Sequence, residues 1–363
     1  MFLQNLTLLN FKNHAAKKLI FNKKINCFIG NNGVGKTNIL DAVYYLCLTK
    51  SYFNTTDAQN MLFGQDFFRL EGNLRTNDRP VQVVFKVQAP RKKELIVNDA
   101  PVPRLSAHIG QLPAVMIAPD DNQLILGGSE ERRRFLDSTI SQVNHSYLEW
   151  LMQYNKYLAQ RNSALKEFAE RRQVDKTLLE SYNVRLAELG TKIYETRRVA
   201  IEKLQPLFRQ FYSQLSLERD IVHFSYESQL HQKPLEQLLE SGLEKDLALQ
   251  RTEWGIHKDD LEFYISPQGN EAAKIKKFGS QGQQKSFILS LKLAEHQFIK
   301  NATGLLPFLL IDDIFDKLDP DRSRQLMQLI SSDDFGQVFI TDTDDSHIRE
   351  ELDALQNFEV FAV

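Results

Sequence analysis

Residues 30–37 read Gly30-Asn31-Asn32-Gly33-Val34-Gly35-Lys36-Thr37, the pattern of glycine, four residues and Gly-Lys-Thr that is typical of a phosphate-binding loop. Glycines let backbone N–H groups curl around phosphate oxygens in conformations that other residues resist. The lysine of such a loop reaches the β- and γ-phosphates, and the threonine hydroxyl holds Mg²⁺. The stretch therefore predicts an ATP site built from all eight residues, with Lys36 also acting in catalysis and Thr37 as a metal ligand.

The neighbouring sequence supports this interpretation. Ile25–Ile29 is short, apolar and β-branched, which predicts a buried strand. In Asn38–Leu48 the apolar residues recur at helical spacing. Strand, glycine-rich turn and helix are the context that a phosphate-binding loop requires, so a chance match is the weaker explanation.

Composition narrows the class of protein. The 363 residues are 42% hydrophobic and 25% charged, as in an ordinary globular protein, and the formal net charge is −2. The two cysteines, Cys27 and Cys47, make neither a disulfide framework nor a metal-binding pattern, which fits a reducing compartment. No apolar run is long enough to span a bilayer and no signal peptide is visible, so we expect a cytoplasmic protein without membrane contact.

The order of elements predicts an α/β fold in three stretches. Residues 1–119 are rich in strands, several with the alternation of an antiparallel sheet. Residues 120–254 have mostly helical periodicity, with long helices over Ser146–Phe168 and Leu178–Leu215, the second bent or interrupted at Pro206, and another over Pro234–Gln250. Residues 255–363 return to alternating strands and helices. We expect one discontinuous ATPase domain, 1–119 with 255–363, and an inserted helical domain.

Two carboxylates follow a second apolar strand. Pro307–Ile311 runs directly into Asp312 and Asp313. In phosphate-binding-loop enzymes a carboxylate at this strand end holds Mg²⁺, a role that Asp312 fits. Asp313 is the candidate catalytic residue that positions or deprotonates the attacking water. Because Asp is one methylene shorter than the Glu of transporter-type ATPases, we expect slow hydrolysis suited to a switch.

A third motif precedes the predicted helix Gln284–Ile299. Its residues resemble the Ser-Gly-Gly-Gln signature of ABC-type ATPases, and small or amide residues at a helix start can close on a γ-phosphate. The string is weak alone, but its position between the phosphate-binding loop and Asp312 strengthens it. The candidate nucleotide-binding residues are Ser280, Gln281, Gly282 and Gln283.

Taken together, these motifs resemble the RecF family of bacterial recombination-repair ATPases, which is related to SMC proteins. The resemblance runs nearly end to end. It includes Asn10–Asn13, Gly30–Tyr45, Pro119–Asp121, Leu124–Gly127, Glu131–Asp137, Gly255–Leu261, Ser280–Lys285 and Asp312–Asp319. Departures are Ile256-His257-Lys258 for the usual Pro-His-Arg, Asp316-Lys317 for Ser-Glu, and Thr341-Asp342-Thr343 where many ABC ATPases carry a switch histidine.

The resemblance implies a fold and a function. The fold is an ABC-type P-loop ATPase head with an antiparallel β subdomain and an inserted helical domain. ATP would join two head-to-tail copies, so that the signature of one completes the loop of the other. The family binds single-stranded DNA or junctions of single and double strands, works with RecO and RecR to help RecA load, and supports replication and the SOS response. Hydrolysis would be slow and DNA-stimulated.

Basic clusters are the candidate DNA contacts, although charge runs are more often solvated faces. They are Arg91–Lys93, Arg132–Arg134, Arg171-Arg172, Arg197-Arg198 and Lys274–Lys277. Two other functions stay open at this point. The ATPase subunit of an ABC transporter would keep signature and loop closer together in sequence, and a small-molecule P-loop kinase would leave Ser280–Lys285 without a role.

Overall fold

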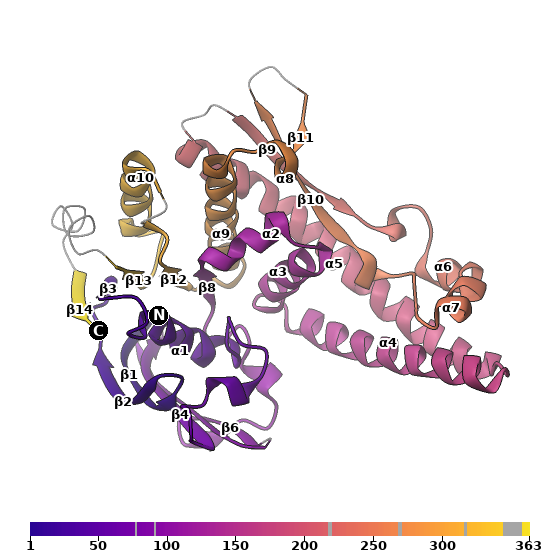
Figure 1. Cartoon of the computed structure of the whole chain (residues 1–363), viewed down its shortest axis with the longest axis horizontal. Coiled ribbons are helices and arrows are strands. Elements are labelled where there is room, and N and C mark those ends of the chain that lie inside the picture. The colour runs from indigo at the N-terminus through magenta and orange to yellow at the C-terminus, as the bar shows by residue number, and fades with distance from the viewer. Residues whose placement is uncertain (77, 91, 217–219, 268–270, 316–317, 344–357) are drawn as a thin grey trace. The chain divides into compact units, whose positions relative to one another are not determined.

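The computed structural model describes residues 1–76, 78–90, 92–216, 220–267, 271–315, 318–343 and 358–363 (Figure 1). Contacts divide the chain into two compact units. The first, called the sheet unit, comprises Met1–Asn122, Gln210–Arg219 and Ser280–Val363. The second, called the helical unit, comprises Gln123–Arg209 and Asp220–Gly279.

A five-stranded parallel sheet forms the centre of the sheet unit. Its strand order is β14-β3-β13-β12-β8, and every neighbouring pair runs parallel. The strands are β14 (Phe358–Ala362), β3 (Ile25–Ile29), β13 (Val338–Asp342), β12 (Phe308–Asp312) and β8 (Ala114–Ile117). β8, β12 and β13 are buried along their whole length, which explains their continuous apolar sequences.

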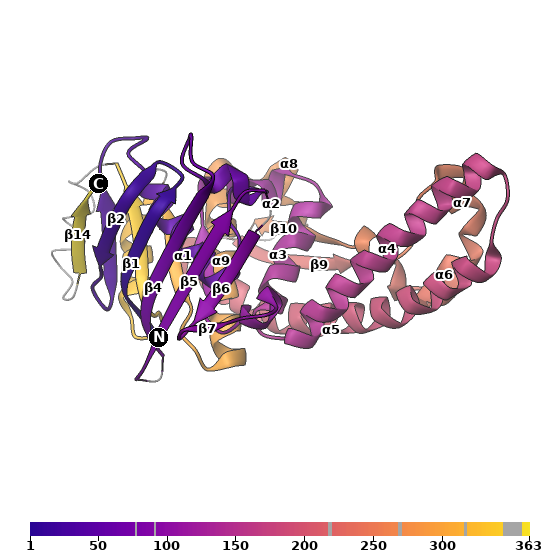
Figure 2. The ribbon, with the colours of Figure 1, turned by 90° about the horizontal axis from the view of Figure 1, so that it is seen from below.

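The second sheet of this unit has six strands in the order β2-β1-β4-β5-β6-β7, which lie side by side in Figure 2. They are β1 (Phe2–Phe11), β2 (His14–Ile20), β4 (Phe67–Thr76), β5 (Arg79–Gln88), β6 (Lys92–Val97) and β7 (Ala100–Pro101). All pairs are antiparallel. On β4, Phe68, Leu70 and Leu74 are buried and alternate with more exposed residues, as expected for a sheet with one covered face.

Helix α1 (Lys36–Leu48) has contacts with strands of both sheets. Eleven of its thirteen residues are buried, so it is apolar around its circumference rather than amphipathic. One continuous core cluster contains residues of α1, of β1, β4 and β5, and of β8, β12 and β13. The phosphate-binding loop therefore leads into the most buried helix of the unit.

Further helices complete the sheet unit. They are α9 (Gln281–Thr303), α10 (Pro320–Ser331) and the 3₁₀ segment η3 (Pro119–Asn122). α9 begins at the predicted signature rather than after it, since Ser280 is its N-cap. The described part of the chain holds no helix that is both long enough and apolar enough to cross a bilayer.

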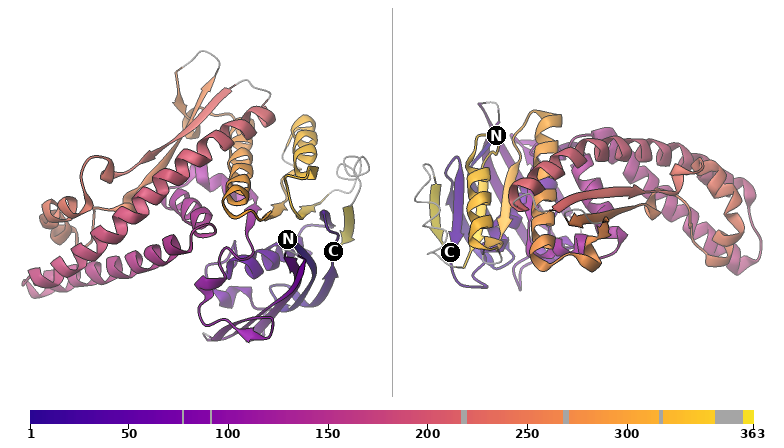
Figure 3. Two further views of the ribbon diagram at one scale, coloured as in Figure 1. Left: turned by 180° about the vertical axis from the view of Figure 1, so that it is seen from behind. Right: turned by 90° about the horizontal axis from the view of Figure 1, so that it is seen from above.

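The helical unit contains two long helices, α4 (His145–Arg171) and α5 (Lys176–Ser216), of which the last seven residues belong to the sheet unit (Figure 3). They pack through Ala164, Leu165, Phe168 and Leu179. The shorter helices are α2 (Gln123–Leu126), α3 (Ser129–Ser141), α6 (Leu235–Ser241), α7 (Leu243–Leu249) and α8 (Ile275–Phe278). An antiparallel sheet of β9 (Asp220–Glu227), β10 (Asp260–Pro267) and β11 (Ala273–Lys274) completes the unit.

Three expectations from the sequence need correction. Pro206 lies inside α5 without interrupting it. The single helix expected over Pro234–Gln250 is two helices that meet at Gly242, where a Cβ would lie 1.8 Å from the indole Nε1 of Trp254. The inserted unit is not bounded by 120–254, because 255–279 group with it, and it is not purely helical, because it carries a sheet.

Some expectations lie outside the described residues. They are the residues Arg91, Asp316 and Lys317, and the part of the expected alternation over residues 255–363 that falls within 344–357.

His296 of α9 makes the stability of the sheet unit depend on pH. It is fully buried, its ring stacks on Phe335 with centroids 4.6 Å apart, and burial lowers its pKa from 6.5 to about 4. Between pH 6.5 and 4 the unfolded chain binds a proton that the folded chain does not, so stability is full above pH 6.5 and falls below it. We expect a slope of up to about 1.4 kcal/mol per pH unit from this residue.

The measurement is urea unfolding between pH 7.5 and 5 for the wild type and His296→Phe, which keeps an aromatic ring against Phe335. The variant is expected to lose stability at pH 7.5 but to show a flatter pH dependence. The exposed His145 supplies the control, His145→Phe. Parallel pH profiles for the wild type and His296→Phe would contradict the assignment.

Candidate functional site

The phosphate-binding loop joins β3 to α1 at the carboxyl edge of the parallel sheet. Gly33 and Gly35 have φ of +85° and +110°, the left-handed region that a side chain strains to adopt. The Lys36 ammonium donates to the carbonyl oxygens of Gly30 and Asn31 at 2.5 and 3.0 Å. The lysine therefore lies folded over its own loop, where phosphate oxygens would compete with those carbonyls.

The turn between β1 and β2 supports the loop from one side. The Asn13 amide donates to the carbonyl of Val34 at 3.0 Å, and the His14 ring bonds the carbonyl of Gly35 at 3.1 Å. A Cβ on Gly35 would lie 2.6 Å from the Asn13 side chain. Asn10–Asn13 were noted in the sequence only as part of the family resemblance, whereas the structure shows Asn13 and His14 bonded to backbone carbonyls of the loop.

Thr37 and Asp312 are brought together from positions 275 residues apart. The Thr37 hydroxyl donates to Asp312 Oδ1 at 2.8 Å. Asp312 is 4% exposed, and burial raises the pKa of its carboxyl. A hydroxyl and a carboxylate thus lie together beside the phosphate-binding loop, and both are hard oxygen ligands for a metal ion.

Asp313, the predicted catalytic carboxylate, follows immediately. Its φ is +48°, which is uncommon for a residue other than glycine. Its N–H donates to the hydroxyl of Thr341 at 3.0 Å, and among the described residues its buried Oδ1 has no hydrogen-bond partner. Such strain and an unsatisfied buried oxygen are features that cluster at functional sites.

The signature residues form the start of α9. Ser280 and Gln283 make a capping box, in which the Ser280 Oγ accepts from the Gln283 N–H at 3.2 Å and the Gln283 amide oxygen accepts from the Ser280 N–H at 2.8 Å. Ser280 and Gln281 are exposed. Gly282 lies so close to Arg322 that a Cβ would be 2.8 Å from its guanidinium. A capped helix start with exposed polar groups can accept an anion from outside the chain.

A chain of buried polar groups links α1 to α9 within the sheet unit. Asp41 of α1 accepts from the Tyr52 N–H at 2.7 Å, and the Tyr52 hydroxyl donates to Asp121 of η3. The Lys292 ammonium of α9 lies 3.6 Å from Asp121 and 3.3 Å from Glu295. Sequence analysis missed Tyr52 and Lys292, since nothing in their local sequence distinguishes them from other helix and loop residues.

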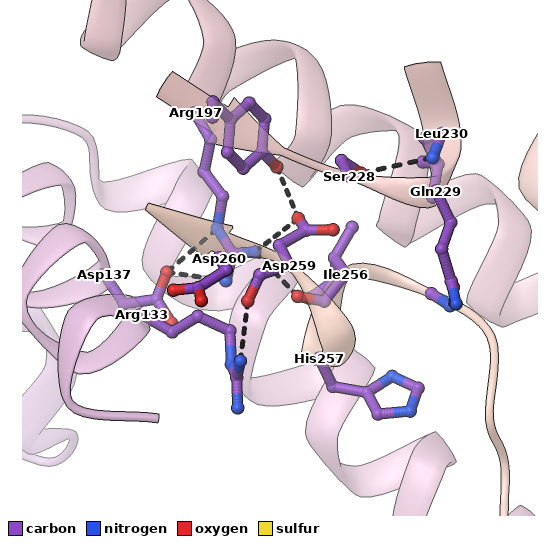
Figure 4. Close-up of polar contacts among 12 residues, drawn as sticks. Arg133, Asp137, Arg197, Ser228, Gln229, Leu230, Ile256, His257, Asp259 and Asp260 are labelled. Carbon is purple, nitrogen blue, oxygen red and sulfur yellow. Dashed lines mark hydrogen bonds and ion pairs between the residues drawn. The ribbon is translucent and has the colours of Figure 1, made fainter. Parts of the chain in front are cut away.

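Two stretches of the family resemblance meet in the helical unit, around the buried Arg197 (Figure 4). Its guanidinium lies between two carboxylates, 2.8 Å from Asp137 and 2.8 Å from Asp259. It also donates to the carbonyl of Ile256 at 2.8 Å, and the Tyr226 hydroxyl donates to Asp259. Glu131–Asp137 and Gly255–Leu261 therefore serve at least to hold α3, α5 and β10 together.

The neighbouring arginines Arg132 and Arg133 belong to the same cluster of polar contacts around Arg197. Arg132 pairs with Asp260 at 2.7 Å, and Arg133 donates to the carbonyl of Asp259 at 2.6 Å. His257 points away from this cluster in Figure 4 and bonds Tyr154 and the carbonyl of Thr252. Burial lowers its pKa to about 4, so this histidine is neutral at physiological pH.

The candidate DNA contacts are thus largely engaged within the chain. Besides the arginines above, Lys93 binds Asp57, Arg171 pairs with Glu167, Arg198 with Glu195 and Glu202, and Lys274 with Glu262. Arg172 and Lys277 are exposed. Most of the charge runs are internal ion pairs or solvated helix faces, so these clusters alone do not define a DNA-binding surface.

Comparison with known proteins gives a consistent result. The family model described as "RecF/RecN/SMC N terminal domain" matches residues 2–361. A protein of Flavobacterium johnsoniae named "DNA replication and repair protein RecF" is 46% identical over 343 residues, which cover 94% of each chain. A protein of the same name from Bacteroides thetaiotaomicron is 41% identical, and the match covers 100% of this chain and 97% of that protein.

Solved structures agree with these relatives. The structure described as "the recombination mediator protein RecF-ATPrS in RecFOR pathway" superposes with a TM-score of 0.88 at 28% identity, and covers 100% of this chain and 96% of its own. An Smc head bound to the C-winged helix domain of ScpA superposes with a TM-score of 0.59 at 16% identity, covering 100% of this chain and 94% of its own, which shows a shared fold. The predicted ABC-type head with an antiparallel sheet is confirmed.

The cluster of polar contacts around Arg197 yields a prediction about stability. Arg197→Met removes the cation and leaves the carboxylates of Asp137 and Asp259 without it, so we expect a loss of about 3–5 kcal/mol in the free energy of unfolding. Arg198→Met is the matched control, because that neighbouring side chain is half exposed and pairs only along the helix surface. Urea unfolding monitored by circular dichroism is the measurement. Equal midpoints for the two variants would contradict the assigned role.

Proposed function

The chain belongs to the RecF family of DNA replication and repair proteins, within the wider RecF/RecN/SMC group, and from that membership we propose that it is an ATP-driven clamp that acts on DNA. The observation that carries the proposal is the convergence of Lys36, Thr37 and Asp312 at one edge of the parallel sheet. This geometry suits a nucleoside triphosphate held by its phosphates.

Mg²⁺ is the proposed companion of ATP. The Thr37 hydroxyl and the buried Asp312 carboxylate are the kind of oxygen ligands that Mg²⁺ takes. In the part of the chain that is described, no cluster of three or more His, Cys, Asp or Glu side chains could hold a metal alone. The remaining ligands would be phosphate oxygens and water, as is usual for Mg²⁺ at nucleotide sites.

We assign the eight loop residues, Gly30–Thr37, to nucleotide binding, and Lys36 and Asp313 to catalysis. Lys36 would stabilise charge on the phosphates, and Asp313 would orient the attacking water. The backbone strain at Asp313 and its shorter side chain fit a slow, DNA-stimulated ATPase that works as a switch.

Ser280–Gln283 are proposed to bind the nucleotide of a second copy of the chain. Ser280 and Gln281 are exposed, and Ser280 caps the start of α9, so this helix start can face the γ-phosphate bound to another molecule. ATP would then join two copies head to tail, and its loss would release them.

The DNA substrate and the protein partners rest on family membership. We propose single-stranded DNA or junctions of single and double strands as the ligand, with cooperation of RecO and RecR in loading RecA and a role in the SOS response. A related structure is described as belonging to the RecFOR pathway. Such a role belongs to the cytoplasm. The relatives give no support to a transporter subunit or a metabolite kinase.

The first test is Lys36→Ala. Loss of the Lys36 ammonium, which would bind the phosphates, should weaken ATP binding at least tenfold, and ATP-dependent DNA binding should disappear with it. Fluorescent ATP titration, followed by titration of gapped, duplex and single-stranded DNA with and without ATP, measures both. Lys50→Ala, beyond the C-terminus of α1, is the control. Unchanged ATP affinity in Lys36→Ala would overturn the site, and equal affinity for all three DNAs would overturn the proposed ligand.

The second test separates a composite site from a self-contained one. Gln281→Arg places a bulky cation at the exposed signature without touching the capping pair of Ser280 and Gln283. We expect this variant to bind ATP as a monomer. Gln237→Arg, an equally exposed change on α6, should dimerise normally.

Mixing Gln281→Arg with Lys36→Ala restores one complete site per pair of chains, because one variant supplies the loop and the other the signature. The mixture should therefore dimerise with ATP when neither variant does so alone. Solution mass by light scattering is the measurement, and a mixture that stays monomeric would contradict the head-to-tail arrangement.

A further inference from the structure

Thr341 occupies a central position at the carboxyl edge of the parallel sheet. It belongs to β13, which lies between β3 and β12 and pairs with both. In the register, Thr341 stands opposite Phe28 on one side and Asp312 on the other. Its side chain is fully buried. Thr341 therefore lies next to Asp312 and Asp313, on the strand between β12 and the strand that leads into the phosphate-binding loop.

The Thr341 hydroxyl bridges the two acidic residues. It donates to Asp312 Oδ1 at 2.7 Å and accepts from the N–H of Asp313 at 3.0 Å. Asp312 Oδ1 also accepts from the Thr37 hydroxyl at 2.8 Å. One carboxylate oxygen is thus held by two hydroxyl donors, one from α1 and one from β13, and the donor from β13 also fixes the backbone of the next residue.

This bridge has a mechanical consequence for Asp313. A non-glycine residue with φ of +48° is held in a region that costs free energy, so its surroundings must enforce it. The hydrogen bond from the Asp313 N–H to Thr341 is such a restraint, and it acts on the residue whose carboxylate is the candidate for orienting water. The same hydroxyl keeps Asp312 aligned when Thr37 turns its oxygen toward a cation.

We propose that Thr341 is the positioning residue of the nucleotide site: its hydroxyl fixes Asp312 for Mg²⁺ and Asp313 for the attacking water, without itself contacting the nucleotide. This inference deepens the proposed function and depends on it. It assigns a role to the end of β13, the position from which Thr341-Asp342-Thr343 were noted in the sequence in place of a switch histidine. The function here is served by a buried hydroxyl, which holds the carboxylates from the neighbouring strand.

The test compares Thr341→Val, which keeps shape and β-branching but removes the hydroxyl, with Thr341→Ser, which keeps the hydroxyl. The affinity for fluorescent ATP is measured in EDTA and then at rising Mg²⁺ concentrations. The readout is the Mg²⁺ concentration at which half of the increase in affinity over the EDTA value is reached. We expect Thr341→Val to need roughly tenfold more Mg²⁺, the size of effect that follows from losing one hydrogen bond to a charged group. Thr341→Ser should stay within about twofold of the wild type, and the EDTA affinities should agree.

Thermal unfolding of each variant shows whether the fold is retained, with Thr139→Val as the control for removing a buried threonine hydroxyl elsewhere. An unchanged Mg²⁺ requirement in Thr341→Val would overturn the proposal. An equal increase of the Mg²⁺ requirement in Thr341→Ser would also overturn it. So would a loss of ATP affinity in Thr341→Val that is as large in EDTA as in the presence of Mg²⁺, because either result indicates a merely structural role. A wild type that binds no ATP would instead overturn the proposed function.

Discussion

Parallel pairing of β3, β13 and β12 is the constraint on which the site depends. Because all three strands run in one direction, the residues that follow them emerge at the same edge of the sheet. Thr37, Asp312 and Thr341 come from three distant parts of the chain and are nevertheless joined by direct hydrogen bonds. A slip of one residue in the pairing of β12 with β13 would turn Asp312 and Thr341 to opposite faces of the sheet, since side chains alternate along a strand.

The sequence was most informative where chemistry and local structure coincide. Gly30–Thr37 and Asp312-Asp313 are contiguous motifs that stand at strand ends, so their neighbours in sequence predicted their position in the fold. Tyr52 and Lys292 could not be found in this way, because their contacts with Asp121 join segments about 70 and 170 residues apart and follow no period. The close approach of the Trp254 indole to Gly242, where α6 and α7 meet, was also hidden, since the two residues are not neighbours in sequence.

Basic clusters show how a charge run can serve as a structural element. Arg132, Arg133 and Arg197 carry the composition of a DNA-binding patch, yet in the helical unit their guanidinium groups bind carboxylates and carbonyls that secure α3, α5 and β10. A buried cation is tolerated only when it is paired and hydrogen-bonded, so Arg197 must be retained together with Asp137 and Asp259. Arg197 is buried, and Arg132 and Arg133 are partly buried and engaged within the chain, so these three arginines alone do not define a DNA-binding surface.

The strand order also has a consequence for how the protein is made. β3 leaves the ribosome early, but its two partners in the sheet, β13 and β14, begin only at Val338 and Phe358. At bacterial synthesis rates of about 5–20 residues per second, β3 waits roughly 15–60 s for its first neighbour. During that time a buried, apolar strand has neither of its pairing partners, and Asp312 has not yet been aligned by Thr341. The nascent chain therefore cannot assemble the candidate nucleotide site before β13 has been synthesised.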